Sequence, residues 1–238
     1  LDSILAQTEI DWELLAINDY STDNSWSILQ QYASKDERIR IFNNTAKGII
    51  PALRLAFAKS RGNYITRMDA DDRMATDKLH LLKSALQQKS KGWLATGYVQ
   101  YFSDGQLGEG YRRYQDWLNA FGESNGHFRE IYRECVIPSP CWMLYREDLI
   151  RCGAFEADTY PEDYDLVFRF YESGLKITTV LQVLHYWRDH ASRSSRNDPN
   201  YANQSYLDLK VPWFLKLDYD EKRTLVLWGA GRKAKTIA

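Results

Sequence analysis

The chain has few cysteines, no long apolar run and almost no net charge, and each absence excludes a class of protein. Its 238 residues include three cysteines, Cys135, Cys141 and Cys152, an odd number without C-x-x-C spacing. This pattern argues against a zinc site or a disulfide framework and fits a reducing compartment. No apolar segment reaches the roughly 18 residues of a membrane span. The formal charge of -1 gives no general attraction to nucleic acid, so we expect no nucleic-acid partner and only local sites for anions.

Apolar strands alternate with amphipathic helices along the first hundred residues. The predicted strands cover residues 13–17, 38–42, 64–68 and 93–99. Helices are expected after the turn at 18–23, between Gly48 and Gly62, and from a cap at Thr76 to about Gln88. This order is typical of a largely parallel sheet with helices on both faces.

The second half of the chain is less regular. Residues 103–135 predict long loops with one or two short helices and a mobile acceptor-side segment. The remaining expected elements are a strand at 142–145, a helix at 162–172, a strand at 177–184, a polar flexible stretch at 188–203 and a strand at 224–228. A Gly-x-Gly turn follows the last strand. We therefore expect one domain over residues 1–205 and a C-terminal extension over 206–238 that opens a second Rossmann-like unit.

Three carboxylates stand within four residues directly after the predicted strand at 64–68. On an extended backbone Asp69 and Asp71 point the same way while Asp72 faces the other side. Two oxygen ligands at the end of a strand suit Mg²⁺ or Mn²⁺ bound together with a phosphate-bearing substrate. The alternative is a solvated turn in which a carboxylate caps the next helix.

Four short segments occur in a characteristic order: Ser3 to Thr8, Asn18 to Asp23, Arg67 to Asp72, and Glu162 to Leu166. Together they resemble the family 2 glycosyltransferases over about residues 1 to 195. The resemblance implies a GT-A fold, a three-layer α/β/α, Rossmann-like architecture with a mostly parallel mixed sheet. It also implies a hexosyltransferase that transfers a sugar, with inversion, from a nucleotide donor to an acceptor hydroxyl.

The resemblance also implies a role for individual residues. Asp163 is the expected general base, and Glu162 is expected on the acceptor side. The expected ligands of Mn²⁺ or Mg²⁺ are Asp71 and His190. The expected donor-binding residues are Asn18, Asp19, Lys47, Arg67, Asp69 and Ala70. The chemistry asks for such a set, because a departing diphosphate builds negative charge and an attacking hydroxyl must lose its proton.

Several of these residues have a second interpretation. Glu162 and Asp163 are also suited to complement the dipole of the helix that they begin. His190 is either a metal ligand or a solvated loop residue, and Arg188 is either a partner of the diphosphate or an ordinary exposed arginine. We interpret His185 as a half-buried strand residue.

The sequence departs from the family pattern at its start. Family members begin with a buried strand that contacts the nucleobase, and Leu1 follows the position of that strand, so we expect further residues before Leu1. Asn18 replaces the first aspartate of its motif. These departures leave open a non-catalytic module that binds nucleotide sugars. The same carboxylates also leave open a nucleotidyl- or phosphoryl-transferring enzyme.

The leading prediction is a bacterial-type enzyme of surface polysaccharide synthesis. Its expected partners are a nucleotide-sugar donor, most simply a UDP-sugar, and a glycan or lipid-linked acceptor. The chain start lacks the basic segment of a signal peptide, so we expect a cytoplasmic location. The sequence leaves open a peripheral association with the inner face of the membrane and the formation of a homo-oligomer.

Overall fold

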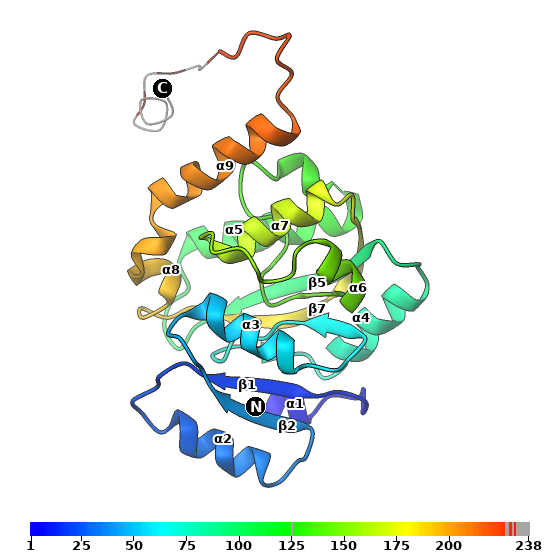
Figure 1. Ribbon diagram of the computed structural model, residues 1–238, viewed down its shortest axis with the longest axis vertical. Coiled ribbons are helices and arrows are strands. Elements are labelled where there is room, and N and C mark those ends of the chain that lie inside the picture. Colours follow the sequence, from blue (N-terminus) through cyan, green and yellow to red (C-terminus); the bar gives the residue numbers. More distant parts are fainter. Residues whose placement is uncertain (125, 227–228, 230, 232–238) are drawn as a thin grey trace.

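The computed structural model describes residues 1–124, 126–226, 229 and 231. Its strands are β1 (Leu14–Asn18), β2 (Ile39–Asn43), β3 (Tyr64–Thr66), β4 (Arg73–Met74), β5 (Trp93–Phe102), β6 (Trp142–Tyr145) and β7 (Lys176–Arg188). Its helices are α1 (Asp2–Leu5), α2 (Ser25–Ala33), α3 (Ile49–Lys59), α4 (Lys78–Gln87), α5 (Glu109–Ser124), α6 (Arg146–Arg151), α7 (Glu162–Glu172), α8 (Ser194–Asn197) and α9 (Asn203–Leu217), with 3-10 helices η1 (His127–Glu130) and η2 (Pro199–Tyr201). Figure 1 shows α2 and the β1–β2 pair at one end of the molecule and α9 at the other.

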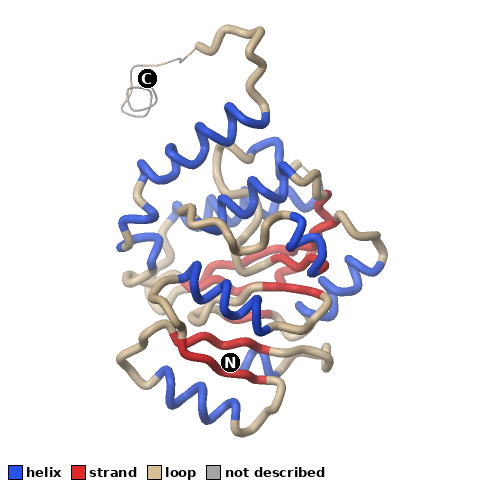
Figure 2. Tube along the Cα trace, viewed as in Figure 1, coloured by secondary structure: helices blue, strands red, loops and turns tan. Residues whose placement is uncertain are grey.

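The strands form two sheets, drawn in red in Figure 2. β1 and β2 are a parallel pair, and the other five strands have the order β3-β6-β5-β7-β4. In the larger sheet β5 and β7 are parallel, whereas β6 is antiparallel to both of its neighbours and β4 is antiparallel to β7. The predicted α/β class with a mixed sheet is confirmed. Its parallel share is smaller than the strand–helix alternation indicates, because β4 and β6 enter the sheet antiparallel.

Each face of the larger sheet supports its own hydrophobic core. Leu94 of β5 is fully buried on the side that carries Phe168 of α7. Its neighbour Ala95 is fully buried on the other side, against the cluster that contains Leu82 of α4. Successive strand residues point to opposite faces, so one strand supplies both cores and the three-layer arrangement follows. Each fully buried Leu or Phe stabilises the fold by roughly 1.5–3 kcal/mol of transfer free energy.

Helix α5 is the largest departure from the expected secondary structure. The prediction of loops and short helices over 103–135 is wrong there, because α5 runs for 16 residues. Its buried side is built from Leu118 and Phe121, with Tyr114 and Trp117 packed beside them. Those residues recur at spacings of three and four, as a helix requires. The signal was present in the aromatic residues and was hidden by the polar residues between them.

Other boundaries differ by a few residues. β3 ends at Thr66 rather than at residue 68, and β7 continues to Arg188. α4 begins at Lys78, and its first turn has no side-chain cap from Thr76. The polar stretch 188–203, expected to be flexible, contains α8 and η2. The side chains of Arg196 and Asp189 form an ion pair at 2.8 Å that ties this stretch together.

The boundary expected at residue 205 falls within α9. Leu209 of this helix belongs to the core on the α7 side, and Trp213 donates its indole N–H to Asp165 at 3.2 Å. Farther on, the expected strand at 224–228 is absent from Thr224 to Val226, which form neither helix nor strand. Residues 227 and 228, which complete the predicted strand, and residue 230 of the Gly-x-Gly turn lie outside the described residues.

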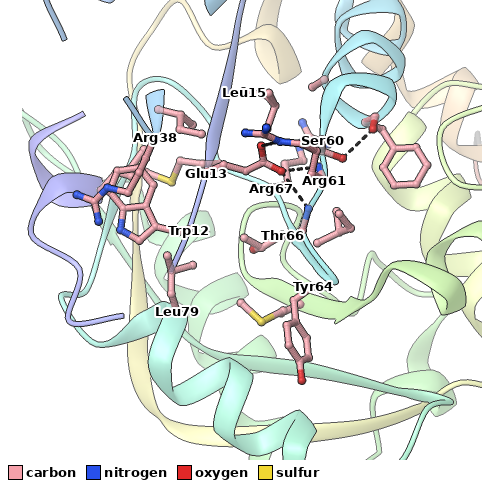
Figure 3. A pocket seen from close by; sticks show the side chains of 18 of the residues that line it. Trp12, Glu13, Leu15, Arg38, Ser60, Arg61, Tyr64, Thr66, Arg67 and Leu79 are labelled. Carbon is pink, nitrogen blue, oxygen red and sulfur yellow. Dashed lines mark hydrogen bonds and ion pairs between the residues drawn. The ribbon is translucent and has the colours of Figure 1, made fainter. Parts of the chain in front are cut away.

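A cavity of about 770 Å³ separates the two sheets. Figure 3 labels Leu15 of β1, Tyr64 and Thr66 of β3 and Leu79 of α4 among the residues that line it. Among the described residues β1 pairs only with β2 and β3 only with β6, so each sheet turns an open edge to the cavity. The expectation of further residues before Leu1 stays a prediction.

Candidate active site

A second cavity, of about 420 Å³, lies where the expected site residues converge. Its wall includes residues of β1 and α3, the loop that follows β3, the start of α7 and the segment after β7. The polar and charged residues that line it are Arg67, Asp69, Asp71, Ser139, Glu162, Asp163, His190, Ser192, Arg193 and Tyr201. The carboxylates expected to serve the metal, the donor and the base are thus gathered around one cavity.

Asp163 lies in the first turn of α7. Its carboxylate accepts a hydrogen bond from the backbone N–H of Tyr164 at 2.8 Å. Burial and the neighbouring charge of Glu162 raise the pKa of Asp163 to about 7, while the charge of Arg67 works in the opposite direction. A carboxyl group with this pKa can take up and release a proton near neutrality, as a general base must.

Glu162 and Arg67 form a buried pair beside Asp163. The guanidinium of Arg67 is 3.0 Å from Glu162 and 3.2 Å from Asp69, and its side chain is 9% exposed. Tyr201 of η2 donates its hydroxyl to the other oxygen of Glu162 at 2.6 Å. Arg67 therefore already has two carboxylate partners. These contacts fix Glu162 and Asp69 at the cavity wall, so Arg67 positions carboxylates as well as lining the expected donor site.

Asp71 and His190 meet at the same cavity. His190 Nε2 is 2.7 Å from an oxygen of Asp71, and His190 Nδ1 is 2.9 Å from Ser192 Oγ. Within the part of the chain that the structure describes, no three His, Cys, Asp or Glu side chains form a ready metal cage. Mg²⁺ and Mn²⁺ need only one or two protein ligands when a substrate diphosphate supplies further oxygens. The Asp71–His190 pair fits that requirement, because carboxylate and imidazole are both suitable ligands for Mn²⁺.

Asp72, the third carboxylate of the loop, is held on the side away from the cavity by a row of buried polar groups. Lys78 is fully buried and donates to His185 Nδ1 at 3.0 Å, while His185 Nε2 is 2.8 Å from Asp72. Because an ammonium group has no acceptor, Nδ1 of His185 accepts and Nε2 carries the proton given to Asp72. Burial lowers the pKa of both Lys78 and His185, and burial also raises the pKa of Asp72 to about 7.

These buried polar groups correct the interpretation of His185 and account for the orientation of Asp72. His185 was expected to be half-buried, and it is completely buried, because β7 lies between β4 and β5. Asp72 points away from the cavity that Asp69 and Asp71 line, as expected. It accepts the backbone N–H of Arg188 at 2.7 Å and so ties the carboxylate loop to the end of β7. The guanidinium of Arg188 pairs with Asp104.

Three of the expected donor-binding residues do not line the cavity. Asn18 donates its amide to Asn43 at 2.8 Å, and Asp19 accepts from the backbone N–H of Gly48 at 3.0 Å. Gly48 has a φ of 125°, a conformation that L side chains rarely adopt, and it caps α3. Lys47 is exposed in the same loop. Asp19 thus organises the loop next to the cavity, while Ala70 lies in the cavity wall itself.

A comparison with known protein families identifies the class of this chain. Residues 1–153 match the model of the glycosyl transferase family 2. The chain belongs to this family. The resemblance inferred from the four sequence motifs is thereby confirmed.

Individual relatives are similar to parts of the chain. A putative teichuronic acid biosynthesis glycosyltransferase, TuaG of Bacillus subtilis, is 34% identical over 104 residues, which are 43% of this chain and 41% of the relative. A glycosyltransferase of Rickettsia bellii is 30% identical over 153 residues, which are 63% of this chain and 21% of the relative. The chain thus spans less than half of the length of either relative.

A solved structure confirms the fold. The crystal structure of residues 1–349 of S. aureus TarS in complex with UDP-GlcNAc superposes with a TM-score of 0.65 and 14% sequence identity. The match covers 93% of this chain and 63% of that one. At this level of identity the likeness concerns the fold, which is the GT-A fold expected from the sequence.

Proposed function

We propose that this chain is the catalytic domain of a metal-dependent, inverting glycosyltransferase that transfers a sugar from a UDP-sugar to a hydroxyl group during polysaccharide synthesis. Asp163 carries the proposal. It is a carboxylate with a pKa near neutrality in the wall of the cavity that also holds Asp71 and His190. Membership in family 2 supports the reaction type, and the presence of UDP-GlcNAc in the TarS structure supports the choice of donor.

In the proposed reaction Asp163 accepts the proton of the acceptor hydroxyl as its oxygen attacks the anomeric carbon of the sugar. The bond between this carbon and the diphosphate breaks, and the nucleoside diphosphate leaves with the electron pair. A single displacement of this kind inverts the configuration at carbon. Glu162 does not compete for the proton, because Arg67 and Tyr201 already occupy its oxygens.

The leaving group needs a counter-charge. Asp71 and His190 would hold a divalent cation there, and such a cation offsets the charge that builds on the diphosphate oxygens. Asp69 stays in place through its ion pair with Arg67. Asp72, held by His185 and Arg188, keeps the carboxylate loop fixed while ligands enter and leave.

The experiment that tests this function is a thermal-shift screen of UDP, GDP, CDP and dTDP in the presence and absence of Mn²⁺. We expect the unfolding temperature to rise most with UDP, and only when Mn²⁺ is present. Incubation with UDP-sugars should then release UDP. Release of UMP would instead favour a nucleotidyl- or phosphoryl-transferring enzyme, and binding without release a non-catalytic module.

The acceptor and the cellular setting belong to the same proposal. TuaG carries a name that places it in teichuronic acid biosynthesis, which supports a glycan acceptor for this chain. Within the described residues, no helix combines the length and apolar character needed to cross a bilayer. We propose a cytoplasmic enzyme that reaches a glycan or lipid-linked acceptor at the inner face of the membrane.

A further inference from the structure

Arg193 is a second arginine at the candidate active site, and the sequence motifs give it no role. Apart from histidine, the cavity wall contains two cationic side chains, Arg67 and Arg193. Arg67 is occupied by Glu162 and Asp69. Arg193, in contrast, forms no ion pair with any carboxylate among the described residues, although four carboxylates line the same cavity. Its charge acts on Asp72 at a distance, where it lowers the pKa of that carboxyl group, but no described carboxylate is in contact with it.

An aromatic cage holds the guanidinium of Arg193 in place. Its Cζ lies 5.3 Å from the ring centroid of Trp187, 5.7 Å from that of Tyr111 and 5.8 Å from that of Tyr101. Tyr101 and Trp187 are themselves stacked, with their planes 9° apart. These rings come from β5, α5 and β7, three elements of the rigid frame. Aromatic faces attract a guanidinium, and the hydroxyl of Tyr101 also interacts with one of its N–H groups.

One of these N–H groups has no partner. Nη1 of Arg193 is buried from solvent and makes no hydrogen bond with the described residues. A buried donor without an acceptor costs about 1–3 kcal/mol, and more for a charged group, so such atoms call for an explanation. Ser139 Oγ is a second buried polar atom without a partner in the wall of this cavity. Both are explained if a polar ligand completes the site.

The charges of the residues that line the cavity indicate which kind of ligand would complete the site. Asp69, Asp71, Glu162 and Asp163 make the wall acidic, so a diphosphate can enter only if cations compensate it. A planar guanidinium matches the geometry of two phosphate oxygens. We propose that Arg193 binds the diphosphate of the donor and offsets the charge of the leaving group. This inference rests on the proposed function and adds to it a protein-borne cation besides the metal.

Arg196 contacts one ring of the same aromatic cage and offers a matched control for Arg193. Its guanidinium also lies over Tyr111, at 5.0 Å from the ring centroid, but it is paired with Asp189 and is not part of the cavity wall. The experiment compares Arg193→Met and Arg196→Met by calorimetric titration with UDP and with UMP, both with Mn²⁺. For Arg193→Met we expect UDP affinity to fall on the order of tenfold or more and UMP affinity to fall much less. Arg196→Met should keep the ratio of UDP to UMP affinity of the unaltered protein, because its guanidinium is paired with Asp189 and does not line the cavity.

Three results would overturn the proposal. An equal loss of UDP and UMP affinity in Arg193→Met would indicate a structural role in the cage. Unchanged UDP affinity would show that Arg193 does not touch the diphosphate. If the unaltered protein binds neither nucleotide, the proposed function fails, and this inference fails with it. Should Arg193→Met not fold, Arg193→Lys replaces it. This variant keeps the charge and loses the planar fork, so we expect a smaller, still UDP-selective loss.

Discussion

Replacing the proposed general base separates binding from chemistry. Asp163→Asn keeps the size of the side chain and an oxygen that can accept from the N–H of Tyr164, so the start of α7 should stay intact. The amide cannot accept the proton of an acceptor hydroxyl. We therefore expect the turnover number to fall by a factor on the order of 10² to 10⁴ while donor affinity stays near that of the unaltered protein.

The pH dependence of the activity gives a second, independent test of the role of Asp163. A base acts in its deprotonated form, and the pKa of Asp163 is raised to about 7 by burial and by Glu162. Activity should therefore rise with pH through this value: about a tenth of the maximum at pH 6 and about nine tenths at pH 8. The dependence should vanish in Asp163→Asn, because its residual activity no longer passes through a titrating carboxyl group.

The assay is the release of UDP from a UDP-sugar, with water as the simplest acceptor hydroxyl, and donor affinity is measured by calorimetry with UDP. Glu172→Gln is the matched control, because it makes the same acid-to-amide change at the far end of α7, where Glu172 pairs with Lys216. It should leave turnover unchanged. If Asp163→Asn loses donor affinity and turnover to the same degree, or keeps the pH profile, Asp163 is not the base.

Two further predictions concern the metal and the core. Asp71→Ala should abolish Mn²⁺-dependent UDP binding without lowering the unfolding temperature, since a loop carboxylate supports no core packing; unchanged calorimetric affinity would contradict the assignment. Leu82→Ala, at a fully buried position, should lower the free energy of unfolding in urea by about 2–5 kcal/mol, whereas the exposed Leu181→Ala should change it by less than about 0.5 kcal/mol.

Local patterns in the sequence predicted much of the fold and part of the candidate active site. Short apolar runs predict β1 and β5, and an alternation of apolar and polar residues predicts β2, because successive side chains of a strand point to opposite faces. The carboxylates after β3 and at the start of α7 stand out because such clusters are costly unless they serve a cation, a proton or a helix end. α5 escaped this reasoning, since its inward face is aromatic and interrupted by polar residues, although its spacing was helical.

Only the tertiary structure decided how these residues are partnered. His185 lies 113 residues from Asp72 and 107 from Lys78, and nothing local in the sequence indicates that these groups meet in the interior. Arg67 pairs with Glu162, which is 95 residues away in the sequence. A residue expected to bind the donor therefore also pairs with a carboxylate of the protein. Burial and charge pairing depend on which strands become neighbours, and strand order is set by long-range packing. The sequence alone therefore determines which chemical groups the site contains, while the fold determines which of them remain free to act.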